Sequence, residues 1–130
     1  MIYSSNFVTN FFVQSFICYV IKKQIMNRTF ISELEELVLL AVGGLSPDAY
    51  AYSIRKEINL QISKSLSLAS IHTVLYRLEK DGLLKSKLGG KSEKRGGRSK
   101  RLFKLTQTGV DTVRNIQDIR HAMWAKMQSI

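Results

Sequence analysis

The chain has 130 residues, 45% of them hydrophobic and 23% charged, which is typical of one folded domain with a short additional element and excludes a chain disordered throughout. Its formal net charge of +10 and its pI near 10.0 favour an anionic partner, either nucleic acid or an acidic membrane surface. The charge is concentrated, because residues 85–104 contain nine basic residues and one acidic residue, a net charge of +8.

The residue types needed for metal or enzyme chemistry are sparse. Cys18 is the only cysteine, so an intrachain disulfide is excluded and a reducing, cytoplasmic setting is the simplest expectation. His72 and His121 stand far apart with no ligand spacing around them, which argues against a metal site. Residues 90–92 read Gly-Lys-Ser like the end of a P-loop, but Lys85 stands where that motif needs a glycine. We therefore expect no enzyme, no cofactor and no metal.

Residues 1–25 form an extra apolar N-terminal segment that differs from the rest of the chain. Residues 7–21 are rich in apolar and aromatic side chains, but this stretch is shorter than the roughly 20 residues that span a bilayer. No basic stretch precedes it, as a signal peptide would require. Three interpretations stay open: a helix that packs on the body or across a dimer, a spurious extension before Met26, or attachment to a membrane surface.

The first predicted helix of the main domain begins near Ser32. This residue and Glu35 have the spacing of a capping box, in which each side chain accepts a hydrogen bond from the other residue's backbone N–H. Gly43 and Gly44 are expected to end the helix. Four apolar residues recur at helical spacing and predict one buried face: Leu34, Leu37, Val38 and Ala41. We expect the acidic residues of the first turn to be solvated: Glu33, Glu35 and Glu36.

The second predicted helix begins at Ser46, Pro47 and Asp48. Ser46 is a suitable N-cap, and Pro47 fits the first helical position because its missing N–H has no helical partner there. Asp48 complements the positive end of the helix dipole. The apolar positions that follow carry the prediction to about Leu60.

The third predicted helix, residues 70–80, separates its faces most clearly. Ser67 or Ala69 precedes it, and the spacing of a buried face recurs at Ile71, Val74, Leu75 and Leu78. At 100° per residue, the opposite side carries Thr73, Tyr76 and Lys80, with His72 and Arg77 beside them. Such groups can reach base edges and phosphates in a major groove, although any solvated helix also has a polar outer face.

Two predicted strands surround the basic segment. Residues 83–88 read as a strand, residues 89–100 as a glycine-rich and charged loop, and residues 101–105 as a strand with alternating polar and apolar side chains. The order of three helices, a strand, a basic loop and a strand predicts a winged helix-turn-helix fold, mainly α with a small β-hairpin. A solvated loop without a binding role is the alternative interpretation of the charge.

A final helix is predicted over residues 110–130, capped by Thr106 or Thr108. Its apolar residues follow at steps of three and four: Val110, Val113, Ile116, Ile119, Met123 and Met127. Because a lone helix of about 20 residues is marginal in water, this stripe needs a partner, either its own domain or a second copy of the chain. Trp124 could line an effector pocket there or be simple packed surface.

Four stretches of the sequence resemble the PadR family of transcriptional regulators: residues 35–42, 52–58, 75–84 and 96–109. The most specific are a helix that ends in Arg-Leu-Glu, two residues and then Gly-Leu, and Gly-Gly-Arg followed by a basic-aromatic strand and Leu-Thr-x-x-Gly. Together the matches cover about residues 30–115. Many relatives have Tyr-Pro where this chain has His72 and Thr73, and the segment before Met26 lies outside the family pattern.

The resemblance implies a winged-helix DNA-binding domain over residues 30–107 and a C-terminal dimerisation helix over residues 108–130. It implies a recognition helix with Ser70, His72, Thr73, Tyr76, Arg77 and Lys80 as DNA-binding residues. It places Arg98, Lys100 and Arg101 at the wing. Together with the basic charge of the loop, this gives Lys91, Lys94, Arg95, Arg98, Lys100 and Arg101 as further expected DNA-binding residues. The expected dimer contacts are Val113, Ile116, Ile119, Met123, Trp124 and Met127.

The expected function is that of a repressor that binds operator DNA as a homodimer and is released by a small hydrophobic effector. Two alternatives stay open: a winged-helix module that binds RNA or a protein partner, and a basic protein associated with a membrane. The sequence specifies neither the operator nor the effector, and it does not distinguish an activator from a repressor.

Overall fold

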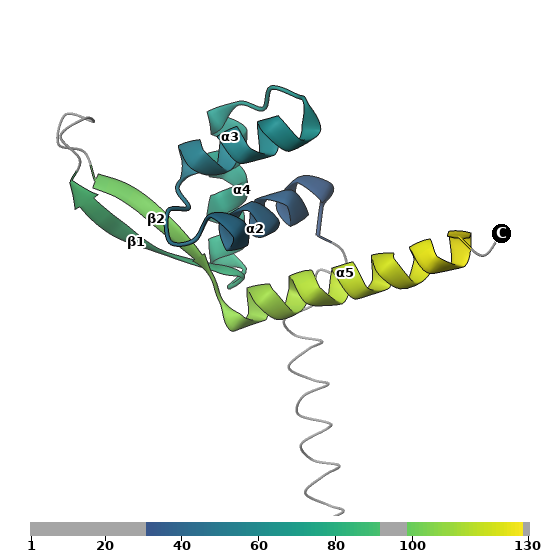
Figure 1. The fold of residues 1–130 in the computed structure, drawn as a ribbon. Helices are drawn as coiled ribbons and strands as arrows, with labels where there is room; N and C mark the ends of the chain where they lie inside the picture. Colours follow the sequence, from purple (N-terminus) through teal and green to yellow (C-terminus); the bar gives the residue numbers. More distant parts are fainter. Residues whose placement is uncertain (1–30, 92–98, 129–130) are drawn as a thin grey trace, which may run out of the picture. The chain divides into compact units, whose positions relative to one another are not determined.

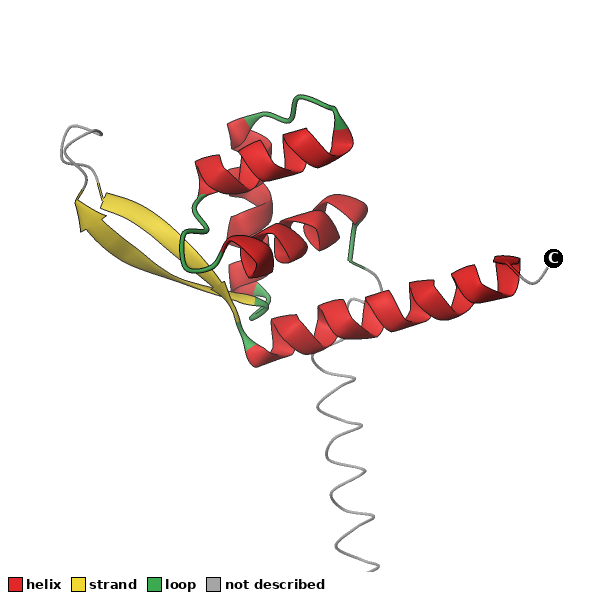
Figure 2. Ribbon diagram, in the orientation of Figure 1, coloured by secondary structure: helices red, strands yellow, loops and turns green. Residues whose placement is uncertain are grey.

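The computed structural model describes residues 31–91 and 99–128 of the chain. Three helices come first: α2 (Glu33–Leu45), α3 (Ala51–Ile62) and α4 (Leu68–Lys80). An antiparallel hairpin of β1 (Leu84–Lys91) and β2 (Ser99–Leu105) follows, and α5 (Gln107–Gln128) ends the fold (Figure 1). The expected class, mainly α with a small β-hairpin, is therefore confirmed (Figure 2). The predicted extra segment, residues 1–25, lies outside the described residues.

The core lies between α2, α3 and α4, each of which turns an apolar face toward the other two. All four residues of the predicted inner face of α4 are buried: Ile71, Val74, Leu75 and Leu78. Opposite them, α2 contributes Val38, Leu39 and Val42, none of which is exposed to solvent, and α3 contributes Ile54 and Ile58. The helical spacing of apolar residues thus predicted the buried face of α4 correctly. On α2 the prediction was wrong in part, because Leu34 and Leu37 are only half-buried and the core receives Leu39 and Val42 instead.

The start of α2 was predicted correctly and its end was not. The capping box forms, with the Glu35 N–H donating to Ser32 Oγ and the Ser32 N–H donating to the Glu35 carboxylate. The helix continues through Gly43 and Gly44 to Leu45. Gly43 is a packing glycine rather than a terminator, because a Cβ there would lie 3.1 Å from Cδ1 of Leu105 on β2.

The prediction for the start of the second helix was wrong. Ser46 is the C-cap of α2, since its N–H donates to the Val42 carbonyl, and the Asp48 N–H donates to the Leu45 carbonyl. These bonds keep Ser46 to Asp48 in a turn, and α3 begins only at Ala51. Its N-cap is Tyr50, whose N–H donates to the Ser53 hydroxyl 3.0 Å away.

Both strands extend further toward the loop than predicted. β1 reaches Lys91 and β2 begins at Ser99, so the connecting loop is shorter than the predicted residues 89–100. The Phe103 N–H, on the edge of β2 away from β1, donates to the Ala49 carbonyl at 2.8 Å. This bond joins the hairpin to the turn before α3. Buried Leu84 and Phe103 fix one face of the hairpin against the helices.

The junction between β2 and α5 is held by Thr106, one of the two predicted caps. Its hydroxyl donates to the Gly82 carbonyl at 2.6 Å and accepts from the Gly109 N–H at 3.0 Å. Gly109 lies directly against the Leu83 carbonyl, closer than any side chain would allow. This close approach explains the glycine in the Leu-Thr-x-x-Gly motif, since α5 can leave the hairpin here only if position 109 has no Cβ.

Two glycine substitutions separate this packing effect from helix propensity. Gly109→Ala should lower the free energy of unfolding by about 1–3 kcal/mol or more, because the new Cβ would overlap the Leu83 backbone. Gly44→Ala should leave it unchanged or raise it by up to about 1 kcal/mol, since no atom lies within 4 Å of its Cβ position. Urea unfolding followed by circular dichroism measures both, and equal effects would contradict the assigned role of Gly109.

Candidate nucleic-acid interface

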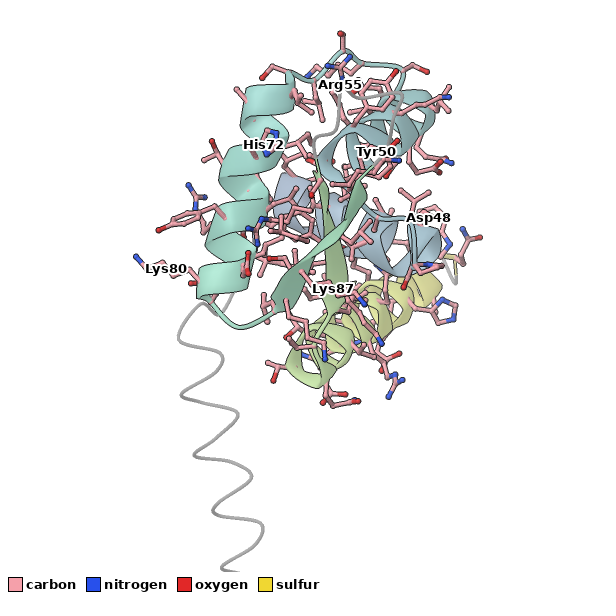
Figure 3. The ribbon with its side chains drawn as sticks, turned by 90° about the vertical axis from the view of Figure 1, so that its left-hand side faces the viewer. Asp48, Tyr50, Arg55, His72, Lys80 and Lys87 are labelled. Atoms are coloured by element: carbon pink, nitrogen blue, oxygen red, sulfur yellow. The ribbon has the colours of Figure 1, made fainter. Side chains whose placement is uncertain are left out.

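The outer face of α4 presents a row of polar side chains to solvent. His72, Thr73, Tyr76 and Lys80 are exposed, and Tyr76 is exposed over 71% of its surface. Figure 3 looks onto the side of the domain from which the hairpin projects, and α4 is visible there along its whole length, with His72 and Lys80 labelled. The predicted recognition residues are therefore brought together on one accessible helix face, beside the hairpin.

The first turn of α4 is organised by hydroxyl groups. Ser67 is the N-cap, as one of the two predicted alternatives, and its Oγ accepts from the Ser70 N–H at 3.1 Å. The Ser67 and Ser70 hydroxyls lie 2.8 Å apart. Thr73 donates its hydroxyl proton to the Ala69 carbonyl at 3.0 Å. Its hydroxyl oxygen can therefore act only as an acceptor toward a bound group, while its methyl group remains available for apolar contact.

Arg77 differs from the other predicted recognition residues, because a buried carboxylate holds it. Its Nη1 lies 3.2 Å from Oε1 of Glu35, a residue only 2% exposed, while the Arg77 side chain itself is 48% exposed. One end of the guanidinium thus ties α4 to α2, and the remaining donors face outward. The expectation that Glu35 lies in a solvated first turn was wrong, because the helices pack directly over it.

Glu36, the next residue, is also buried and also paired, which corrects the same expectation for this position. The Arg120 Nη2 atom lies 2.7 Å from one carboxylate oxygen, and the Gln117 side-chain amide donates to the other at 2.9 Å. Both partners stand on α5. Of the three acidic residues in the first turn of α2, only Glu33 is exposed as predicted.

The described part of the hairpin places only some of the predicted wing residues. Lys94, Arg95 and Arg98 lie outside the described residues, and Lys91 is placed only as a strand residue opposite Ser99. Arg101 is exposed and donates from Nη1 to the Ser86 hydroxyl at 2.9 Å. Ser86 in turn donates to Oε1 of Glu79 on α4 at 2.7 Å, so this relay fixes the base of the hairpin relative to α4.

A cluster of cations and aromatic rings that sequence reasoning missed joins β2 to α3. The Lys100 Nζ atom lies 4.4 Å from the centre of the Tyr50 ring, which stacks on Tyr52 with 6.4 Å between ring centres. The Arg55 guanidinium lies 5.9 Å from the centre of the Tyr52 ring. Tyr50 and Arg55 can be followed in Figure 3. The sequence shows the two tyrosines two residues apart, but it does not show that Lys100, on a strand distant in sequence, lies over Tyr50.

Beside this cluster, α3 carries a shallow groove with further cationic groups. Its lining combines aromatic, basic and apolar side chains: Tyr52, Arg55, Lys56, Asn59 and Leu60. The Asn59 side-chain oxygen accepts from the Leu66 N–H at 2.9 Å and so fixes the turn between α3 and α4. Lys56 thus adds one further cation to Arg55 on this side of α3.

The predicted dimer residues divide into two groups along α5. Val113 and Ile116 are half-buried against the domain, whereas Ile119, Met123, Trp124 and Met127 are exposed. At 100° per residue, the row formed by Ile119, Met123 and Met127 lies about a quarter turn from the side that carries Arg120 and Gln117. The exposed apolar row therefore lies beside the contact with α2 rather than within it.

The remaining predictions concern absent features. Within residues 31–91 and 99–128, no three Asp, Glu, His or Cys side chains gather in a way that could hold a metal ion. No helix in this part of the chain is both long and apolar enough to cross a bilayer.

Comparison with known proteins gives a family and a fold. The model of the Transcriptional regulator PadR-like family matches residues 39–115, more than half of the chain. The chain is similar in structure to a PadR-like transcriptional regulator from Bacillus cereus, with a TM-score of 0.61, 19% identity, and coverage of 74% of this chain and 88% of that one. A PadR family transcription regulator from Clostridium difficile gives a TM-score of 0.61 at 21% identity, covering 75% and 97% of the two chains.

A third similar structure is FabT from Streptococcus pneumoniae, determined in complex with DNA. It has a TM-score of 0.57 and 21% identity, and the match covers 96% of this chain and 79% of that one. No curated protein matches the sequence. At these identities the structural matches establish the fold, and the family model establishes the relationship.

Substitutions at the two neighbouring basic positions of α4 should separate a structural role from a surface role. Arg77→Ala should lower the free energy of unfolding by about 1–3 kcal/mol, because it leaves the buried Glu35 carboxylate without this donor. Lys80→Ala should change it by less than about 0.5 kcal/mol, since Lys80 is exposed. Chemical denaturation of both variants tests this, and equal stability would mean that the Arg77–Glu35 pair does not hold α4.

Proposed function

Because this chain belongs to the PadR-like family of transcriptional regulators, we propose that it acts by binding duplex operator DNA as a homodimer, through the outer face of α4 and the basic hairpin. In this proposal α4 enters a major groove, and the hairpin reaches the adjacent backbone. We place this activity in the cytoplasm, the setting expected of a transcriptional regulator. The family consists of regulators rather than enzymes, so we assign no catalytic residue.

One observation carries the proposal: the exposed polar face of α4 lies beside the hairpin, whose base is fixed to α4 by the hydrogen bonds from Arg101 through Ser86 to Glu79 (Figure 3). A single duplex can touch both surfaces only if they face the same way. His72, Thr73 and Tyr76 supply the groups that reach base edges, and Lys80 supplies a cation for a phosphate. The likeness to FabT, which was determined in complex with DNA, supports this use of the fold.

The surface of α5 supports the proposed homodimer. Its exposed residues include Ile119, Met123, Trp124 and Met127, and Met123 is exposed over 65% of its surface. Large apolar side chains that recur along one helix favour association with a second copy, because association removes them from water. A symmetric dimer would present two α4 helices to successive turns of the duplex, about 34 Å apart.

We further propose repression as the mode of regulation, since a dimer that occupies an operator excludes other proteins from it. A small hydrophobic effector that bound beside Trp124 would change the packing of α5 and thereby the separation of the two α4 helices. Release of DNA would follow if the new separation no longer matched the half-sites.

The DNA-binding proposal is tested by selecting bound sequences from random duplexes and measuring affinity for the selected duplex by fluorescence anisotropy. His72→Ala should weaken binding by about 1–3 kcal/mol and relax the preference at one base position, as expected for loss of a base contact. His121→Ala is the matched control, since His121 is an exposed histidine on α5. The affinity of this variant for the selected duplex should equal that of the wild type.

Selection that recovers no preferred duplex would contradict operator binding. Stronger competition by single-stranded RNA than by duplex DNA would favour an RNA-binding module instead. If the wild type prefers one duplex sequence and His72→Ala keeps the same base preference and affinity, His72 does not contact the DNA bases.

The dimer is tested by adding one charge to α5 at two positions. Met123→Glu should shift the protein from dimer to monomer in sedimentation experiments, because it places a carboxylate within the apolar row. Ala125→Glu adds the same charge on another side of the helix, at an exposed residue, and should remain dimeric. A monomeric wild type, or equal behaviour of the two variants, would contradict dimerisation through this row.

A further inference from the structure

The first half of α4 carries small side chains at the centre of its outer face. At 100° per residue, Ala69, Thr73, Tyr76 and Lys80 lie within an arc of about 60°. All four are exposed. Ala69 and Thr73 stand one turn apart at the N-terminal end of this row, whereas Lys80 stands in the last turn of the helix. We call Ala69 and Thr73 the methyl pair.

The hydroxyl group of Thr73 is engaged within the helix. It donates to the Ala69 carbonyl, one turn earlier, at 3.0 Å. A threonine hydroxyl has a single proton, so this bond leaves no donor for a base. The methyl group is the other part of this exposed side chain. Toward a bound base, position 73 therefore offers a methyl group and the lone pairs of an oxygen.

The surroundings of Thr73 determine which base edge fits there. Its neighbour in the preceding turn, Ala69, also offers only a methyl group, and both residues are exposed. A polar base edge pressed against two methyl groups would lose water without gaining a hydrogen bond, which costs free energy. An apolar group gains free energy from the same burial. Thymine is the only one of the four bases that presents such a group in the major groove, its 5-methyl group.

We propose that Thr73 recognises thymine through its methyl group, which packs together with that of Ala69 against the 5-methyl group of the base. The inference rests on the proposed operator binding and names the base that this part of α4 prefers. The N-terminal residues of a recognition helix are the ones that contact base edges, and the methyl pair lies in the first half of α4.

The test uses the selected duplex with each thymine replaced in turn by deoxyuridine, together with its symmetry-related thymine in the other half-site. Deoxyuridine keeps the hydrogen-bonding groups of thymine and lacks only the 5-methyl group. Two variants divide the side chain, because Thr73→Val keeps a methyl group without the hydroxyl and Thr73→Ser keeps the hydroxyl without the methyl group. Affinity is measured by fluorescence anisotropy for every pair of protein and duplex.

Thr112→Ser is the matched control. Thr112 stands on α5, and its hydroxyl donates to the Thr108 carbonyl one turn earlier at 2.8 Å, the same kind of bond that Thr73 makes. The control therefore removes a methyl group from an equivalent threonine outside the proposed interface. It should bind every duplex as the wild type does.

For the wild type, deoxyuridine at one thymine position should weaken binding by about fourfold per half-site, the factor expected when one methyl group is no longer buried. Thr73→Ser should bind the unmodified duplex more weakly by the same factor and lose nothing further with deoxyuridine at that position. Thr73→Val should bind at least as tightly as the wild type and keep the deoxyuridine loss. Both variants should unfold like the wild type on heating, because Thr73 is exposed.

Several results would overturn the inference. A loss with Thr73→Val as large as that with Thr73→Ser would assign the contact to the hydroxyl group. A deoxyuridine loss that Thr73→Ser keeps in full would assign the thymine methyl group to another side chain. A wild type insensitive to deoxyuridine at every position, or half-sites without thymine, would show that α4 recognises no thymine methyl group. Failure of the proposed function would look different, because the wild type would then prefer no duplex sequence at all.

Discussion

Two adjacent carboxylates in the first turn of α2 determine how the rest of the structure is arranged. Glu35 is 2% exposed and Glu36 is 6% exposed, and a buried carboxylate is costly unless donors surround it. Besides the Ser32 N–H, Glu35 accepts a hydrogen bond from Arg77 on α4, whereas Glu36 accepts from Gln117 and Arg120 on α5. One helical turn therefore holds the helix proposed to read DNA and the helix proposed to form the dimer.

This arrangement has a consequence for DNA binding by a dimer. The distance between two α4 helices depends on how each is oriented relative to its own α5, and half-sites one turn apart tolerate little error in that distance. Arg77 of α4 and Arg120 of α5 pair with carboxylates on the same turn of α2. Because both helices are attached to this one turn, they have little freedom to move independently. The relay from Glu79 through Ser86 to Arg101 extends the same constraint to the hairpin. Polar contacts that link α2, α4, α5 and the hairpin thus act together with the apolar core to position α4, the hairpin and the proposed dimer surface.

Local patterns were sufficient to predict the buried face of α4 and three of the helix caps. The four apolar residues of α4 are buried, Ser32 and Glu35 form their capping box, and Ser67 and Thr106 act as caps. Contacts between distant residues could not be predicted in this way. Arg77 and Arg120 are 42 and 84 positions from their glutamates, so Glu35 and Glu36 looked like solvated first-turn acids. The start of α3 was missed because Ser46, Pro47 and Asp48 are suited equally to a helix start and to the turn that they form.

The most direct test of this account is a double-mutant cycle between Glu36 and Arg120, with the free energy of unfolding measured in urea. Glu36→Gln and Arg120→Met should each destabilise the protein, and the double variant should lose less than the two single losses combined. The account predicts a coupling energy of about 0.5–3 kcal/mol between α2 and α5. Strictly additive losses would contradict it, because α5 would then be held by something other than this buried carboxylate.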